Sequence, residues 1–141
     1  MVSTVSDTKP RILQYELPGE WTLLVGAAAA DNDVLSTTIA RPDDWWFHVE
    51  DVPGSHVILR AKADEEPSRE TLRQAASVAA YHSKARTAGT VPVYCTRARY
   101  VRKPRGVKTG TVEVTSGTLL KVHPEVSFAK RVQYRGDVNA N

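Results

Sequence analysis

Apolar and polar residues alternate along several short stretches of the chain, which is the pattern of half-buried β-strands. The first such stretch is Trp21–Val25, and two others, Trp45–Glu50 and His56–Arg60, are rich in aromatic and β-branched residues. Between the latter two stands Val52-Pro53-Gly54-Ser55, whose proline and glycine suit the central positions of a type II turn. We therefore expect a strand, a turn and a second strand in this part of the chain.

A helical period follows these strands. Small and apolar residues recur at helical spacing from Leu72 to Ser83, and Ser68 precedes them as a good N-cap. The spacing predicts a long helix over residues 68–87. The alanine-rich stretch 27–40 favours a short helix, although its threonines and isoleucine lower the helical propensity.

Strand patterns return after the helix. Val91–Arg97 and Ala98–Lys103 have strand composition, and Thr111–Val114 and Thr118–Val122 are β-rich runs separated by a short glycine-containing loop. We expect the last two runs to form a hairpin. One long helix and one short helix among strands joined by hairpins predict an α+β fold with a mainly antiparallel sheet.

The two ends of the chain lack a periodic pattern. We expect flexible tails at residues 1–17 and 126–141 and one domain at residues 18–125, which suits a chain of 141 residues. Nothing resembles a signal peptide, and no apolar run is long enough to cross a bilayer, so we expect a cytoplasmic protein. The single cysteine, Cys95, excludes an internal disulfide and is expected to be a buried strand residue.

Charge is distributed unevenly along the chain. The net charge is only +3, yet no acidic residue occurs from position 71 to position 112. This block contains nine cations, namely Arg73, Lys84, Arg86, Arg97, Arg99, Arg102, Lys103, Arg105 and Lys108. A block of one sign attracts polyanions, so nucleic acid is the expected partner, with a merely solvated basic face as the alternative.

The densest part of this block is RARYVRKPRGVK, residues 97–108, which we expect to bind the ligand. Arginine and lysine contact phosphates, and guanidinium and tyrosine planes can stack on bases. The proline and glycine in this segment favour an exposed loop. The candidate ligand-binding residues are Arg97, Arg99, Arg102, Lys103, Arg105 and Lys108.

A second group of candidate ligand-binding residues lies outside this run and consists of Trp46, His48, His56, Arg60 and Lys84. Trp46 is either a base-stacking platform or a core residue, and the register of the strands decides whether His48 and His56 share a face. If they do, two imidazoles could cleave a phosphodiester by general acid-base catalysis, with Arg60 or Lys84 stabilising the transition state. The alternative is that the second histidine holds the turn by hydrogen bonds. Metal-binding spacings such as HxH or HExxH are absent, so we expect no metal.

Several of these residues together resemble the NFACT-R domain, an RNA-binding module of ribosome quality-control factors. The resemblance covers approximately residues 20–123 and rests on Gly26, Asn32-Asp33, Trp46-Phe47-His48, Pro53-Gly54-Ser55-His56-Val57, Ala79-Ala80-Tyr81-His82-Ser83-Lys84-Ala85-Arg86, Val91-Pro92-Val93, Val101-Arg102-Lys103-Pro104 and Gly110. Two segments depart from the family pattern. Ala27-Ala28 replaces the usual Arg-Asn, and Val93-Tyr94-Cys95-Thr96 lacks the usual Asp-Tyr pair before the threonine.

The resemblance and the charge distribution together predict a non-catalytic RNA-binding module without cofactors, linked to translation or ribosome quality control. The expected partner is tRNA or rRNA, with the ribosome as a wider partner, and the oligomeric state is left open. Three alternatives remain at this point. They are a histidine-assisted RNA-processing enzyme, an adaptor for an acidic protein, and a DNA-binding module, since phosphate contacts do not identify the sugar.

Overall fold

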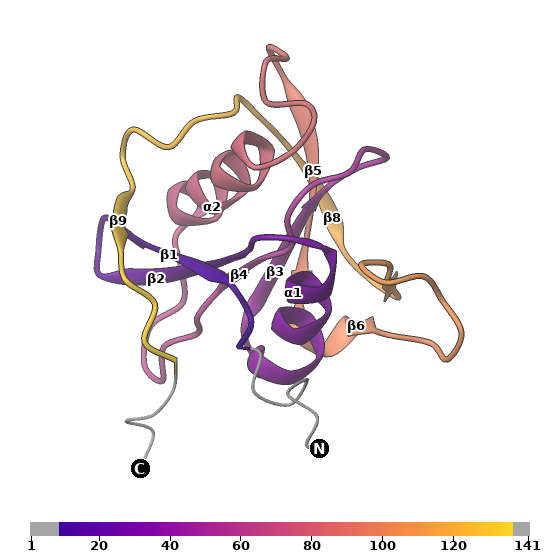
Figure 1. Ribbon diagram of the computed structural model, residues 1–141. Helices are drawn as coiled ribbons and strands as arrows, with labels where there is room; N and C mark the ends of the chain where they lie inside the picture. Colours follow the sequence, from indigo (N-terminus) through magenta and orange to yellow (C-terminus); the bar gives the residue numbers. More distant parts are fainter. Residues whose placement is uncertain (1–8, 137–141) are drawn as a thin grey trace.

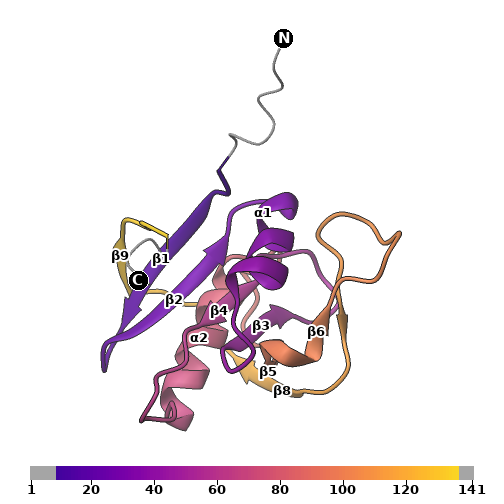
Figure 2. The same ribbon diagram turned by 90° about the horizontal axis from the view of Figure 1, so that it is seen from below.

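A seven-stranded antiparallel sheet forms the centre of the computed structural model, which describes residues 9–136 (Figure 1). The strand order is β8-β5-β3-β4-β2-β1-β9. The strands are β1 (Ile12–Leu17), β2 (Trp21–Gly26), β3 (Trp45–Val49), β4 (Val57–Leu59), β5 (Val91–Arg97), β8 (Thr118–Val122) and β9 (Lys130–Val132). Figure 2 shows the two ends of this order, with β9 beside β1 on one side and β8 on the other.

A helix covers each face of the sheet. On one face lies α2 (Arg69–Tyr81), and on the other lies α1 (Ala29–Val34), which continues as the π-helix η2 (Leu35–Ile39) (Figure 1). Alternate residues of β3 supply the two cores, because successive strand side chains point to opposite faces. Phe47 packs with the buried alanines of α2, and Trp46 packs with Leu35.

The prediction of an α+β fold with one long helix is wrong. The longest helix, α2, has 13 residues, so the fold is mostly antiparallel sheet with two short α-helices. Its predicted start is confirmed, because the Ser68 hydroxyl accepts a hydrogen bond from the Thr71 N–H at 3.1 Å. The helix ends early because its next backbone groups bond elsewhere. The carbonyl of His82 accepts from the Ser55 N–H, and the Lys84 N–H donates to the Pro53 carbonyl, both at 2.9 Å.

The predicted type II turn before β4 is also wrong. Gly54 does not adopt a positive φ, whereas Asp51 does, at 64°. A Cβ atom on Gly54 would lie 2.7 Å from the Cβ of Ser83. The glycine is therefore required by the close approach of the segment before β4 to the end of α2, where residues 54 and 83 form an isolated β-bridge.

Strands occupy parts of the segments that were expected to be loose tails. Residues 12–17 form β1, which pairs with both β2 and β9, and β9 lies within the expected C-terminal tail. Tyr15 and Leu17 are buried in the core, and this burial orders the segment. The remaining parts of the expected tails, residues 1–8 and 137–141, lie outside the described residues.

A small second sheet replaces the predicted hairpin over residues 111–122. β7 (Glu113–Val114) pairs with β6 (Val101–Arg102), whereas β8 pairs with β5. The predicted strand at 98–103 is interrupted by the 3-10 turn η3 (Ala98–Tyr100). Residues 103–112 therefore form a long loop that connects the two strands of this small sheet, and Figure 1 shows it extending from the end of β6.

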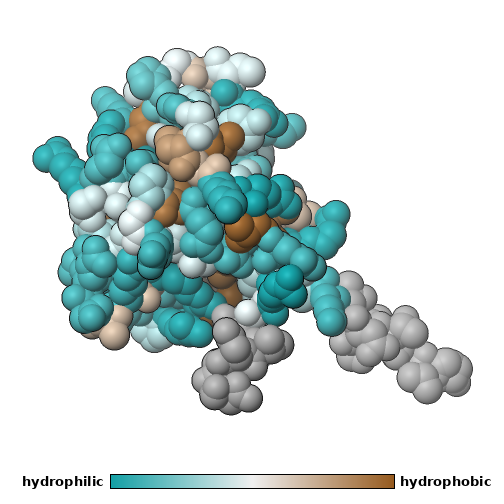
Figure 3. Space-filling view, turned by 90° about the vertical axis from the view of Figure 1, so that its left-hand side faces the viewer, coloured by the Kyte–Doolittle hydropathy of each residue, from teal (hydrophilic) through white to brown (hydrophobic). Residues whose placement is uncertain are grey.

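The surface on the β9 side carries mostly hydrophilic residues, with small apolar patches between them (Figure 3). Within residues 9–136, no helix has the length and apolar character needed to cross a membrane. Cys95 is buried in β5, and burial raises the pKa of its thiol to about 12. The thiol is therefore protonated at neutral pH, in agreement with a structural role.

Candidate functional site

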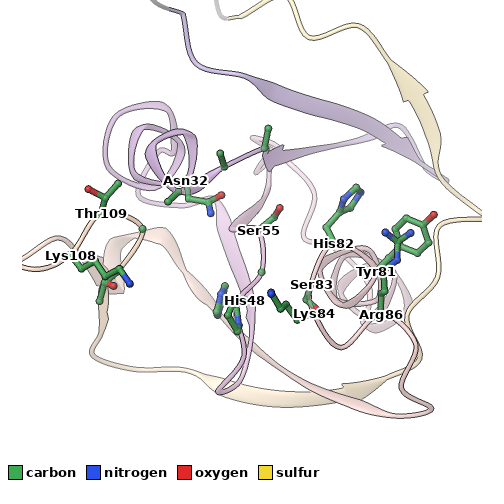
Figure 4. A pocket seen from close by; sticks show the side chains of 17 residues that line it. Asn32, His48, Ser55, Tyr81, His82, Ser83, Lys84, Arg86, Lys108 and Thr109 are labelled. Carbon is green, nitrogen blue, oxygen red and sulfur yellow. The ribbon is translucent and has the colours of Figure 1, made fainter.

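A pocket of about 710 Å³ opens between the end of α2 and the loop at residues 103–112 (Figure 4). Its lining comes from four places in the sequence, and many of the residues that carry the family resemblance meet in it. We call it the basic pocket. The lining residues are Ala27, Ala28, Ala29, Asn32, His48, Pro53, Gly54, Ser55, Tyr81, His82, Ser83, Lys84, Arg86, Lys108, Thr109, Gly110 and Thr111.

Close backbone contacts hold the floor of the basic pocket. The amide oxygen of Asn32 accepts a hydrogen bond from the His56 N–H at 3.0 Å, and the Ser55 hydroxyl donates to the Gly26 carbonyl at 2.6 Å. A Cβ atom on Gly26 would lie 2.1 Å from the Asn32 amide oxygen. These residues therefore join β2, α1 and β4 into one unit beneath the pocket.

The loop on one side of the pocket is fixed to α1 through Gly110. Both carboxylate oxygens of Asp33 accept from the Gly110 N–H at 3.1 Å, and Lys103 lies 3.4 Å from the same carboxylate. Gly110 has a φ of 86°, which favours glycine, and a Cβ there would approach the Ala29 Cβ to 2.9 Å. This attachment brings Lys108 to the wall of the pocket.

Three cations line the basic pocket from opposite sides. Lys84 and Arg86 follow α2, and Lys108 belongs to the facing loop (Figure 4). The described lining contains no carboxylate, and within residues 9–136 no ion pair joins these three cations to an acidic side chain. The Arg86 guanidinium stacks over the Tyr81 ring, 4.2 Å from its centroid. The pocket is therefore suited to an anion.

The strand register resolves the relative position of the two histidines. Because Phe47 pairs with Val57, the adjacent residues His48 and His56 are opposite each other, and their ring centroids are 5.3 Å apart. Of these two histidines, His48 lines the pocket and His56 does not. His56 is 2% exposed, and its Nδ1 lies 2.7 Å from the Ser36 hydroxyl. An acid-base pair acting on one phosphate is not formed, because only one of the two imidazoles is accessible.

Burial keeps these imidazoles neutral at physiological pH. Burial lowers the pKa of His48. The pKa of His56 is lowered to about 4, first by burial and then by the nearby His48 ring. The pKa of His82, which lines the other side of the pocket, is also lowered to about 4, by burial first and then by Arg86 and Arg131. The positive charge of the pocket therefore comes from lysine and arginine, and it does not depend on histidine protonation.

The stability of the protein is expected to fall as the pH drops below about 6.5, because His56 must take up a proton on unfolding. Its pKa is about 4 in the folded protein against an ordinary value of 6.5, so the unfolded state binds more protons between these values. The free energy of unfolding should be about 2 kcal/mol lower at pH 5 than at pH 7 from this residue. Urea denaturation measures both values. In His56→Gln the difference should shrink by that amount, and an unchanged difference would exclude His56 as its source.

Two of the expected ligand-binding residues, Trp46 and Arg60, instead hold the fold together. Trp46 is 2% exposed and donates from its indole Nε1 to the Ser36 hydroxyl at 2.9 Å, so it cannot serve as an open stacking platform. Arg60 forms an ion pair of 2.7 Å with Asp44, whose side chain is 1% exposed. Neither residue lines the basic pocket, so both belong to the framework of the fold.

The basic run at residues 97–108 divides into two groups. Its first four cations lie beside carboxylates, in the ion pairs Arg97–Glu66, Arg99–Asp43, Arg102–Glu113 and Lys103–Asp33. Three of them, Arg99, Arg102 and Lys103, line a smaller pocket of about 380 Å³. Arg105 and Lys108 are exposed, and of the whole run only Lys108 lines the basic pocket.

Sequence reasoning missed Tyr81 and Arg86 as lining residues. Both belong to the run at residues 79–86 that carries the family resemblance, and Arg86 is part of the basic block. Their stacking contact and their position beside Lys84 depend on the early end of α2, which the periodicity did not show. The clearest sequence signal for this part of the pocket was the pair of cations, Lys84 and Arg86, directly after the helical pattern.

Comparison with known proteins gives one consistent result. The family model described as the NFACT protein RNA binding domain matches residues 13–116. The chain is 41% identical over 116 residues to the Rqc2 homolog RqcH of Bacillus subtilis, and 40% identical over 106 residues to that of Streptococcus suis. These matches cover 82% and 75% of this chain but only 20% and 19% of the relatives, so the chain spans about a fifth of their length.

A solved structure has the same fold. It is the C-terminal part of the fibronectin/fibrinogen-binding protein from Streptococcus suis, with a TM-score of 0.76 and 36% sequence identity. The match covers 84% of this chain and 47% of that one.

Proposed function

Because the chain belongs to the family of NFACT protein RNA-binding domains, we propose that it binds RNA through the basic pocket and acts as a non-catalytic module. The observation that carries this proposal is the opposed arrangement of cations. Lys84 lies across the pocket from Lys108, Arg86 lines it beside Tyr81, and the described lining contains no carboxylate (Figure 4). Such an arrangement attracts phosphates, and its floor provides polar groups that can contact a nucleotide.

The RNA is one that belongs to translation, either tRNA or rRNA, and the module acts in ribosome quality control at the ribosome in the cytoplasm. This assignment is supported by the relatives named Rqc2 homolog RqcH. Arg105 and the cations around the smaller pocket supply additional phosphate contacts. We assign them a lesser part, because carboxylates beside Arg99, Arg102 and Lys103 offset much of the attraction.

Removal of the three pocket cations is expected to weaken RNA binding about thirtyfold. The variant is Lys84→Ala, Arg86→Ala and Lys108→Ala combined, and each lost cation–phosphate contact is taken as somewhat below 1 kcal/mol, about 2 kcal/mol in total. Fluorescence anisotropy with labelled tRNA measures the affinity. The slope of log affinity against log salt should also become less negative by about 2, as expected for three phosphate contacts in unpaired RNA.

A matched control removes three exposed cations outside the pocket. Arg69→Ala, Lys130→Ala and Arg135→Ala combined change the net charge by the same amount, and none of the three lines the basic pocket. We expect this variant to keep its affinity within about threefold, since only non-specific attraction is reduced. Equal losses in both variants would contradict the pocket as the binding site. Competition among tRNA, an rRNA fragment and duplex DNA then separates the candidate ligands.

A further inference from the structure

The size of the basic pocket restricts what part of an RNA can enter it. A volume of about 710 Å³ lies in the range of sites that hold one small molecule and enclose most of its surface. An A-form duplex is instead recognised along its backbone and shallow minor groove, over many base pairs. The pocket therefore has the dimensions of a site for a nucleotide that is not base-paired.

A row of side chains leads from the pocket across the sheet. His48 of the pocket pairs with Tyr94 in β5, and Tyr94 pairs with Leu119 in β8. Residues directly opposite each other in neighbouring strands lie on the same face of a sheet, about 5 Å apart. The three side chains therefore form one line that begins at the wall of the pocket and ends at the edge strand.

The outer end of this row is open to solvent. Leu119 is 43% exposed, and Tyr94 is partly exposed at the edge of the core cluster on this face. Lys121, two residues after Leu119 on the same face of β8, is also exposed. An apolar and aromatic surface beside cations fits nucleobases, because bases stack on such surfaces while lysine contacts the phosphates.

We propose that the basic pocket receives one unpaired nucleotide of the RNA and that the adjoining single strand crosses Tyr94 and Leu119 toward Lys121. This inference rests on the proposed function and names the substrate class of the same site as single-stranded RNA or an unpaired end or loop. His48 lines the pocket at the start of this row, and burial lowers the pKa of its imidazole, so the positive charge of the pocket comes from its lysines and arginine. The cations on either side hold the phosphates.

The test compares a short labelled RNA as a single strand with the same RNA annealed to its complement. In fluorescence anisotropy we expect the single strand to bind at least about tenfold more tightly than the duplex, since only the single strand can present unpaired bases for stacking. Binding of the single strand should be weaker in the variant that lacks the three pocket cations, Lys84→Ala, Arg86→Ala and Lys108→Ala combined. Equal binding of both RNAs, still lost in this variant, would overturn the inference and leave the proposed function intact. Binding of neither RNA by a protein that still binds labelled tRNA would also overturn the inference alone, whereas the absence of tRNA binding as well would overturn both.

A second measurement tests the path across the sheet. Tyr94→Leu keeps an apolar side chain on the strand but removes the aromatic ring, and we expect about tenfold weaker binding of the single strand. A 2-aminopurine base in the RNA should lose fluorescence on binding to the wild type and keep more of it in this variant. Tyr100→Leu is the matched control, because Tyr100 is 40% exposed but lies outside the row. Equal behaviour of the two variants would exclude Tyr94 from the path.

Discussion

Asp44→Ala is expected to lower the free energy of unfolding by about 3–5 kcal/mol, the cost typical of breaking a buried ion pair. The Asp44 side chain is 1% exposed, and its carboxylate accepts from the Arg60 guanidinium at 2.7 Å and from the backbone N–H groups of Arg41 and Ala61 at 2.8 Å. Alanine removes all three acceptor contacts at once. Chemical denaturation with urea measures the change.

The neighbouring residue provides a matched control. Asp43 also pairs with an arginine, Arg99, but the two side chains are 69% and 47% exposed. Exposed pairs contribute about 0–1 kcal/mol, so Asp43→Ala should change the free energy of unfolding by less than about 1 kcal/mol. A similar loss in both variants would show that burial does not determine the strength of these pairs. Asp44→Ala should keep its RNA affinity at temperatures where it is folded, because Asp44 does not line the basic pocket.

Gly54→Ala is expected to lower the free energy of unfolding by about 3 kcal/mol and to weaken RNA binding at least about tenfold. The new methyl group would lie 2.7 Å from the Ser83 Cβ and 3.1 Å from its Cα, so the backbone must move. The two hydrogen bonds that join residues 53–55 to the end of α2 would be strained or broken. Because Lys84 is held by one of them, the change displaces a pocket cation.

Two measurements separate these effects. Urea denaturation gives the stability, and anisotropy with labelled RNA under conditions where the variant is folded gives the affinity. Gly89→Ala is the control, since nothing lies within 4 Å of a Cβ built there and the residue has no positive φ. It should leave both quantities within experimental error. Normal affinity in a folded Gly54→Ala variant would contradict the role of this contact in positioning Lys84.

The local elements of the sheet were predictable from the chain because they depend on near neighbours. Alternation indicated β2, β3 and β5 at nearly their observed bounds, and the Ser68 cap marked the start of α2. Strand pairing was less predictable, since it depends on distant partners. Nothing in residues 111–122 shows that β7 joins β6 while β8 joins β5.

The charged block shows the same division for the candidate site. Its composition indicated a polyanion partner, but composition does not show which cations have acidic neighbours in space. Asp43 and Glu66 approach Arg99 and Arg97 from 56 and 31 positions away in the chain. Lys84 and Lys108, both candidates from the start, turned out to face the same pocket, whereas Trp46 was buried.

By itself, the sequence determined the position of the basic block, the strand-forming segments and the start of the main helix, because charge content, alternation and capping are properties of residues close together in the chain. The tertiary structure decided where α2 ends, which cations remain without carboxylate neighbours among the described residues, and that a pocket exists at all. Each of these depends on contacts between segments far apart in sequence. Three close contacts of the fold need a glycine, because a Cβ atom would collide with the facing residue. They are Gly26 against Asn32, Gly54 against Ser83 and Gly110 against Ala29.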